Sequence, residues 1–264
     1  MLRAVAVKAV AIAAIVAIAM LAPAAWRWPG IIVILVATVG FLTYAIWHPH
    51  SGFFAPIVDR IHGRALGGDI ALTFDDGPDP VFTPQILDVL AAHGARATFF
   101  VLGCRAAEHP DVIRRIVAEG HALGTHTQTH PIAFHFSSPA GVAAEISAGV
   151  ASVAAVVPET RLTLFRPPQG LRTPLFGSAW KSFARKGFVC VTWSVKALDS
   201  FATTADKIVA RVTPHLGPGA IVAMHDGTGL GGGHDRAPTI AALDRLLATC
   251  EARGLRCIAL DPTA

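Results

Sequence analysis

The first 47 residues of the chain are almost wholly apolar and contain no Asp or Glu. Two uncharged apolar runs, residues 9–25 and 31–47, are each about 17 residues long, the lower limit for a helix that crosses a bilayer. Trp and Tyr flank both runs, where their rings favour the membrane–water interface. Residues 26–30, Trp-Arg-Trp-Pro-Gly, predict a short turn. The pattern predicts a membrane anchor over residues 1–47, a two-helix transmembrane hairpin that contacts the lipid bilayer through residues 9–47.

A cleaved signal peptide is the alternative interpretation of this segment, with Ala22-Pro23-Ala24 as a poor cleavage site. The second apolar run favours the anchor, because a signal peptide needs no second span. We therefore expect a two-pass protein of the cell (inner or plasma) membrane. Its orientation stays open. Arg27 alone lies in the turn, which favours both ends in the cytoplasm, whereas a polysaccharide substrate requires the opposite. The basic residues that flank the two ends of the hairpin are Arg3, Lys8, Arg60 and Arg64.

After the anchor, short apolar runs alternate with helical patterns. The strand-like runs lie at 69–75, 97–102, 122–125, 162–165, 189–195, 220–224 and 256–260. Helices are predicted to start at Thr83-Pro84 and Pro110-Asp111, to run from Ser138 to about Val157, and to occupy 174–186, 204–215 and 239–253. This alternation predicts an α/β fold over residues 69–264, a parallel sheet covered by helices as in a distorted (β/α)7-type barrel. Residues 48–68 are predicted to be the linker.

The charge of the chain narrows the classes of partner. It has 22 Lys and Arg residues against 18 Asp and Glu; three of the basic residues lie in the predicted anchor, which leaves 19 against 18 in the remainder. The globular part is near neutral and has no basic tract, which argues against nucleic acid as a partner. The four cysteines show no metal-type spacing, and Cys190, in an apolar strand, is predicted to be a core thiol.

Two adjacent carboxylates, Asp75 and Asp76, follow the first predicted strand. Neighbouring carboxylates repel each other, and a fold usually retains such a pair for a cation or a shared proton. His126 and His130 follow the third strand, four residues apart. Two imidazoles near a carboxylate are a ligand set suited to zinc with an open coordination position.

Polar residues follow three other predicted strands at the same end. Arg166 follows the fourth strand, Asp199 the fifth, and His225 ends the sixth. The C-terminal ends of parallel strands converge on one face of a β/α barrel, where catalytic loops gather. We therefore expect these clusters to form one active site.

The order and spacing of these motifs resemble those of the carbohydrate esterase family 4 polysaccharide deacetylases, also called the NodB-homology domain. The resemblance covers roughly residues 69–260. Thr73-Phe74-Asp75-Asp76 is similar to the first family motif, which implies that Asp75 is the general base and Asp76 a metal ligand. His126-Thr127-Gln128-Thr129-His130 is similar to the second, which implies that both histidines bind the same divalent ion, by preference Zn²⁺.

Arg166-Pro167-Pro168-Gln169-Gly170 is similar to the third family motif, which implies that Arg166 holds the catalytic base. Gln169 stands where the family usually has an aromatic residue, whose backbone N–H faces the oxyanion. The backbone donor survives this change, but the aromatic wall does not.

The fourth motif, Asp-x-x-Asp-Trp, aligns with residues 196–200. Asp199 keeps the second acidic position, which supports the catalytic histidine. Lys196 replaces the first Asp, and Ser200 replaces the Trp that lines the cleft. Ala223-Met224-His225 is similar to the fifth motif, Leu-x-His, which implies that His225 is the general acid.

The resemblance implies a metal-dependent hydrolase that removes an N-acyl group, by preference N-acetyl, from an amino sugar in a polysaccharide or glycan. One alternative is a deacylase or deformylase of an undecaprenyl-phosphate-linked amino sugar, favoured by the anchor and the altered groove. Another is an inactive carbohydrate-binding module, which would be expected to lack a base, an acid or a ligand. The sugar, the acyl group, the native metal and the oligomeric state stay open.

Several polar residues near these motifs are interpreted as structural. Asp79 and Asp226 are typical of turns. Lys196 is interpreted as a solvated loop lysine, with a cation of the site as the alternative. His234, beside Gly231-Gly232-Gly233, is the one further histidine expected near the barrel mouth.

Overall fold

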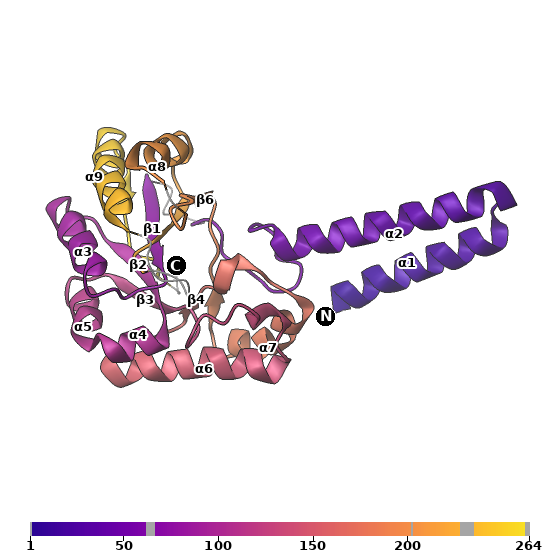
Figure 1. Ribbon diagram of the computed structural model, residues 1–264, viewed down its shortest axis with the longest axis horizontal. Helices are drawn as coiled ribbons and strands as arrows, with labels where there is room; N and C mark the ends of the chain where they lie inside the picture. The colour runs from indigo at the N-terminus through magenta and orange to yellow at the C-terminus, as the bar shows by residue number, and fades with distance from the viewer. Residues whose placement is uncertain (1, 62–66, 202, 228–234, 262–264) are drawn as a thin grey trace.

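A computed structural model describes residues 2–61, 67–201, 203–227 and 235–261. These residues form a long helical hairpin that projects from an α/β domain (Figure 1). The sequence expectations for Arg64 and His234 lie outside the described residues.

The hairpin consists of α1 (Leu2–Leu21) and α2 (Ala24–Trp47), which lie side by side along their length (Figure 1). By length and composition α2 is apolar enough to cross a membrane, whereas α1 contains a shorter apolar stretch, Ala9–Leu21. Helix α6 (Pro139–Val156) passes the same test, although it packs on the domain.

The turn of the hairpin lies earlier than the sequence pattern predicts. Residues 26–30 belong to α2, with Pro29 inside the helix, and the chain turns at Ala22-Pro23. Pro23 is the N-cap of α2, with φ −54° and ψ 146°; its ring disfavours helical dihedrals in the residue before it and so ends α1. The Arg27 Nε donates to the Ala22 carbonyl at 2.9 Å and closes the turn. Pro29, near the start of its helix, does not break it.

Eight strands among the described residues form one sheet. Seven follow the order β5-β4-β3-β2-β1-β7-β6, and β8 pairs with the start of β1. The pairings between these strands are parallel, so the predicted parallel sheet and distorted (β/α)7-type barrel are confirmed. The bounds are β1 (Asp69–Asp75), β2 (Ala97–Val101), β3 (Ala122–Thr125), β4 (Leu164–Phe165), β5 (Val189–Cys190), β6 (Val195–Lys196), β7 (Ile221–His225) and β8 (Arg256–Cys257).

One predicted strand, residues 189–195, is divided into β5 and β6. Its first part pairs with β4, and its end pairs with β7. Between the two parts, the Thr192 N–H donates to the Val58 carbonyl at 2.8 Å and the Ser194 N–H to the Ile221 carbonyl at 3.0 Å. The segment bends because its two ends pair with the two opposite ends of the curled sheet, and it thereby bridges them.

Helices surround the sheet (Figure 1). Their bounds are α3 (Phe82–Ala92), α4 (Gly103–Glu108), α5 (Pro110–Ala118), α6, α7 (Pro174–Arg185), α8 (Ala205–Val212) and α9 (Ala237–Ala252), with short 3-10 turns at Phe134–Phe136, Pro168–Gly170 and Thr213–His215. The predicted helices are present. For example, the Ser138 Oγ accepts from the Gly141 N–H at 3.1 Å at the start of α6, where Pro139 takes the first position. Helix α4 was not predicted, because its six residues are too short to show a period.

The apolar core lies on both sides of the sheet. Phe74, Phe99 and Leu243 belong to a buried cluster between the sheet and its covering helices. A second cluster, which includes Phe165 and Trp180, packs beneath α6 and α7. Cys190 belongs to it and is buried, as predicted; burial raises the pKa of its thiol to about 12.

The segment that joins the hairpin to the domain is packed against the domain up to residue 61. Val58 and Arg60 form isolated β-bridges with Val191 and Ala220. The Thr192 Oγ1 also donates to the Pro49 carbonyl at 2.9 Å.

A buried arginine fastens the beginning of this joining segment. Arg172 has no exposed surface, and its guanidinium donates to the carbonyls of His48, Ser51 and Gly170. Its backbone N–H donates to the Ile46 carbonyl in the last turn of α2. The end of the hairpin and the loop after β4 are therefore tied to the same side chain.

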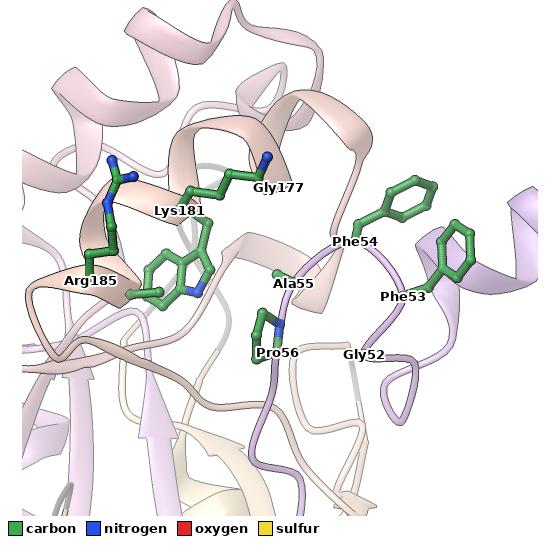
Figure 2. A pocket seen from close by; sticks show the side chains of 10 residues that line it. Gly52, Phe53, Phe54, Ala55, Pro56, Gly177, Lys181 and Arg185 are labelled. Atoms are coloured by element: carbon green, nitrogen blue, oxygen red, sulfur yellow. The ribbon is translucent and has the colours of Figure 1, made fainter. Parts of the chain in front are cut away.

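A cavity of about 550 Å³ lies between the joining segment and α7 (Figure 2). Phe53, Phe54 and Trp180 give it an apolar lining, and Lys181 and Arg185 of α7 border it. The backbone of the segment approaches α7 closely: a Cβ on Gly177 would lie 2.3 Å from the Phe54 carbonyl oxygen. Only glycine fits there.

Candidate active site

The predicted motif residues meet in one pocket of about 190 Å³ at the C-terminal ends of the strands. Strand register explains the meeting, because Asp75 at the end of β1 is the direct partner of His225 at the end of β7. The lining residues are Asp75, Asp76, His126, His130, Gln169, Trp193, Lys196, Ser200, Phe201, Ala223 and His225. Arg166 and Asp199 lie behind this wall, buried and in contact with Asp75 and His225 respectively.

Asp76, His126 and His130 form the one group of three or more potential metal ligands found within the described residues, with ligand atoms within 4.8 Å of one another. The Nε2 atoms of both histidines lie 3.6 Å from the Asp76 Oδ1. That oxygen is buried and accepts no hydrogen bond. An unsatisfied buried carboxylate oxygen is costly, and a cation between the three side chains would satisfy it. The donor set fits a divalent ion such as Zn²⁺.

Further hydrogen bonds orient the three potential ligands. The His126 Nδ1 lies 2.7 Å from the Arg166 carbonyl oxygen, to which it donates, so that Nε2 is left as the free acceptor facing Asp76. Burial lowers the pKa of His126 to about 3, which keeps the ring neutral. The loop between the two histidines is held by Glu145 of α6, whose carboxylate accepts from the N–H groups of Gln128 and Thr129, both at 3.1 Å.

A buried ion pair holds Asp75. The Arg166 Nη1 donates to the Asp75 Oδ1 and to the Thr73 Oγ1, both at 2.7 Å. Its Nη2 donates to the Thr192 carbonyl at 2.9 Å, and its guanidinium carbon lies 4.2 Å from the centroid of the Phe100 ring. Arg166 has no exposed surface, so its position is set from several sides.

His225 and Asp199 form a second buried pair. The His225 Nδ1 lies 2.8 Å from the Asp199 Oδ1, and the His225 N–H donates to the Asp199 Oδ2 at 2.9 Å. Burial lowers the pKa of His225, but the charge and hydrogen bond of Asp199 outweigh it and raise this pKa to about 8. Burial raises the pKa of Asp199, but His225 and then Arg236 outweigh it, and the net shift is downward. The pair favours a charged imidazolium against a carboxylate.

Sequence reasoning missed the residues that support this pair. Thr239 Oγ1 donates to the Asp199 Oδ2 at 3.0 Å, and Arg236 Nη1 donates to the Asp199 carbonyl at 2.6 Å. Arg236 also donates twice to the Gly227 carbonyl and is almost fully buried. Both residues lie at or beside the start of α9, distant in sequence from the motif, so no local spacing indicates them.

Strained backbone is concentrated in the motif loops. The non-glycine residues with positive φ in the described chain are Asp76, Thr127, His130, Gln169 and Leu198. Each lies in one of the loops predicted to form the site. Such conformations persist only where the surroundings enforce them, and they cluster at functional sites.

The Gln169 loop shows what enforces one of these conformations. Gln169 has φ 55°, and the next residue, Gly170, has φ 69°. A Cβ on Gly170 would lie 2.3 Å from the Trp193 ring. The His135 Nε2 lies 2.7 Å from the Pro168 carbonyl oxygen, and Arg172 donates to the Gly170 carbonyl. The loop is therefore held on both sides of Gln169.

Asp79 and Asp226, both interpreted as structural, differ in their surroundings. Asp79 is a turn residue as predicted, since its Oδ1 accepts from the N–H groups of Val81 and Phe82. Asp226 is more than a turn residue. It has no exposed surface, the Thr83 Oγ1 donates to its Oδ2 at 2.6 Å, and burial raises its pKa to about 7. It braces the turn after Asp76, where Gly77 leaves room for it.

The wall of the pocket differs from the sequence expectation in one place. Lys196, interpreted as a solvated loop lysine, is the last residue of β6 and lines the pocket. The aromatic rings in the lining are Trp193 and the exposed Phe201. Trp180 is a buried residue of α7 and does not line this pocket.

The curled barrel and the clustered carboxylates, histidines and arginine at its mouth are typical of a hydrolase. Comparison with known proteins identifies its family. A sequence model of the family described as Polysaccharide deacetylase matches residues 63–187. A chitooligosaccharide deacetylase of Bradyrhizobium sp. (strain ANU 289) is 37% identical over 210 residues, covering 76% of this chain and 94% of the relative.

A peptidoglycan-N-acetylglucosamine deacetylase of Bacillus cereus is 36% identical over 194 residues, covering 73% of this chain and 86% of the relative. Among solved structures, the family 4 carbohydrate esterase from Streptomyces lividans in complex with acetate gives a TM-score of 0.65 with 33% identity. The match covers 76% of this chain and 96% of that one. The chain belongs to the polysaccharide deacetylase family, carbohydrate esterase family 4. It is a hydrolase that acts on carbon–nitrogen bonds other than peptide bonds.

Proposed function

We propose that this protein removes N-acetyl groups from amino-sugar residues of a polysaccharide or glycan, in a metal-dependent reaction. The observation that carries the proposal is the orphaned Asp76 Oδ1 between two histidine Nε2 atoms. On either side of it lie a carboxylate held by an arginine and a histidine held by a carboxylate. The relatives named for chitooligosaccharide and peptidoglycan deacetylation support the same reaction.

Asp76, His126 and His130 would hold the cation, by preference Zn²⁺. When bound, a divalent ion supplies Lewis-acid polarisation of the acyl carbonyl and lowers the pKa of water. Asp75 accepts the proton of the attacking water, and Arg166 fixes the Oδ1 of this base and balances its charge. We assign the role of oxyanion donor to the backbone N–H of Gln169, a residue that lines the pocket.

His225 completes the reaction by donating its proton to the leaving amine nitrogen as the C–N bond breaks. An amine anion is a prohibitive leaving group, so this proton is essential. Asp199 orients the ring through Nδ1, leaving Nε2 to face the pocket, and stabilises its charged form. The raised pKa of His225, about 8, keeps the acid protonated near neutral pH.

We further propose that the α1–α2 hairpin anchors the enzyme in the cell membrane as a two-pass segment. The length and hydropathy of α2 support this role. The anchor, together with Gln169 and Ser200 at two usually aromatic positions, favours a second candidate substrate, a lipid-linked amino sugar deacylated at the membrane surface. An anchored enzyme meets lipid-carried substrates at high effective concentration.

One experiment tests the reaction and separates the substrates. The full chain is purified in detergent, loaded with Zn²⁺, and assayed for acyl release from chitin oligomers, peptidoglycan and an undecaprenyl-phosphate amino sugar. We expect release that is abolished by a chelator and restored by the metal. Faster turnover of the lipid-linked sugar selects the second candidate, and faster turnover of the polymers by about tenfold, or about 1.4 kcal/mol in the barrier, selects the first. Release that survives chelation would contradict metal dependence.

A further inference from the structure

We propose that Lys196 binds an anionic group of the substrate, a phosphate or carboxylate close to the N-acyl group. The proposal rests on the deacetylase function proposed above and names the class of amino sugar that the site takes: one that carries a negative charge. It applies equally to a sugar phosphate and to an acidic sugar.

The position of Lys196 in the sheet directs it to the reacting groups. Lys196 is the register partner of Ala223 on β7, and His225 lies two residues further along that strand. Residues two apart on a strand share a face of the sheet, so Lys196 is next to the row that carries the proposed acid. All three residues line the same pocket.

The charge of Lys196 is not neutralised by a direct ion pair with any residue that the structure describes. Asp75 pairs with Arg166 and Asp199 with His225, while Asp76 faces the two histidines of the proposed metal site. The Lys196 Nζ instead lies over the Trp193 ring, 5.0 Å from its centroid. This contact holds a half-buried ammonium group in place without cancelling its charge.

Two departures from the family pattern point to the same ligand. At position 196 the charge is reversed, because Lys replaces Asp, and at position 200 a hydroxyl replaces the ring of Trp. Both side chains line the pocket. A ring stacks on the neutral face of a sugar, whereas an ammonium group and a hydroxyl donate hydrogen bonds to phosphate or carboxylate oxygens. The wall has therefore changed from one suited to a neutral sugar to one suited to an anion.

The volume of the pocket limits where the anion lies. At about 190 Å³ it is smaller than the about 300–1,000 Å³ of pockets that enclose whole drug-sized ligands. It takes the acyl end of one sugar residue, so the charge that Lys196 meets belongs to that residue or to its immediate substituent.

The test compares matched substrates on the full, metal-loaded chain. Acyl release is measured from a neutral N-acetylglucosamine oligomer, from N-acetylglucosamine 1-phosphate and from an oligomer containing the carboxylate of N-acetylmuramic acid. For Lys196→Gln we expect the ratio of kcat/KM on the better anionic substrate to kcat/KM on the neutral one to fall at least tenfold. Lys196→Arg should recover most of the ratio, and Lys196→Asp should invert the preference. The matched control is Lys207→Gln on α8, which is exposed and does not line the pocket.

Each outcome is decisive. The anionic substrate whose kcat/KM falls more in Lys196→Gln, the sugar phosphate or the carboxylate oligomer, shows which anion Lys196 binds. Equal losses on neutral and anionic substrates, or no loss, would overturn the proposal and leave the deacetylase function intact. If the wild type releases no acyl group from any substrate, the deacetylase function falls. Calorimetric binding of N-acetylglucosamine 1-phosphate to wild type and Lys196→Gln then decides the role of Lys196, and equal affinities would refute it.

Discussion

Asp75 and His225 are register partners at the C-terminal ends of two adjacent parallel strands, β1 and β7. Adjacent strands lie about 4.8 Å apart, so one backbone pairing sets the spacing between the proposed base and the proposed acid. The two side chains have separate supports, Arg166 for Asp75 and Asp199 for His225. Each of the two groups is therefore held in place by its own buried partner.

The pH profile of the enzyme should depend on Asp199. His225 acts in its protonated form, so kcat/KM falls as the pH rises through its pKa. Burial lowers that pKa, and Asp199 raises it to about 8. Asp199→Asn removes the charge, so the pKa of His225 falls and the basic limb of the profile moves to lower pH. We also expect a loss of about 10²-fold or more near neutral pH.

The control for this shift is Asp206→Asn. Asp206 is an exposed carboxylate on α8, paired with Arg245, and its removal should leave the basic limb in place. A profile for Asp199→Asn that titrates at the wild-type pH would show that another group is the acid.

His126→Ala should lose most of the bound metal. Removing one of three protein ligands takes away a bond that the remaining donors cannot replace. Elemental analysis of the purified full chain should give close to one divalent ion in the wild type and in the exposed-site variant His215→Ala. Unchanged metal content in His126→Ala would refute the ligand assignment.

Substitutions of the two adjacent carboxylates, Asp75 and Asp76, should have different effects on metal binding and turnover. Asp75→Asn is expected to keep the metal and to lose about 10²–10⁴-fold in turnover, since the carbonyl is still polarised while the base is absent. Asp76→Ala should lose both metal and turnover. Metal content and acyl release are measured on the same preparations. If Asp75→Asn loses metal while Asp76→Ala keeps it, the two roles are exchanged.

Ser200→Trp should raise turnover of chitin oligomers relative to a soluble single sugar. A ring at position 200 restores a flat apolar surface on which a neutral sugar face packs. The control is Ser147→Trp on an exposed position of α6. If both variants change the ratio of the chitin-oligomer rate to the single-sugar rate equally, Ser200 does not determine the substrate preference of the pocket wall.

Arg172→Leu should destabilise the fold and detach the joining segment. The change removes the donor from the buried Gly170 carbonyl and from the partly buried carbonyls of His48 and Ser51, at a cost of about 2 kcal/mol. Arg185→Leu, at the exposed end of α7, should stay within about 0.5 kcal/mol of the wild type. Thermal unfolding in detergent measures the stability of both variants. Equal unfolding midpoints for the two variants would contradict the role of Arg172 in holding the joining segment.

The parallel sheet and the clustering of the motifs were predictable, because alternating strands and helices force the C-terminal ends of strands to one face. Asp75, His126 and His225 meet for that reason, and their catalytic roles stay predictions. What the pattern could not reveal depends on distant partners. Asp226 is buried because Thr83 of α3 bonds to it, and Arg236 reaches back from the start of α9.

Local ambiguity explains the other differences. Either of two prolines near the tip of the hairpin, Pro23 or Pro29, is typical of a turn. The chain turns at Pro23, where Arg27 donates a hydrogen bond to the Ala22 carbonyl. Lys196 was interpreted as a loop residue because the apolar run before it was taken as one strand. The break after Cys190 carries Lys196 onto a second strand and into the pocket.

On the proposal that the hairpin anchors the enzyme, the tie that Arg172 makes between the last turn of α2 and the loop after β4 would also limit where the enzyme works. With the hairpin in a bilayer, these hydrogen bonds would restrict the movement of the barrel and keep its mouth within a thin layer above the lipid surface. Acyl groups would be removed only from sugars that pass through this thin layer.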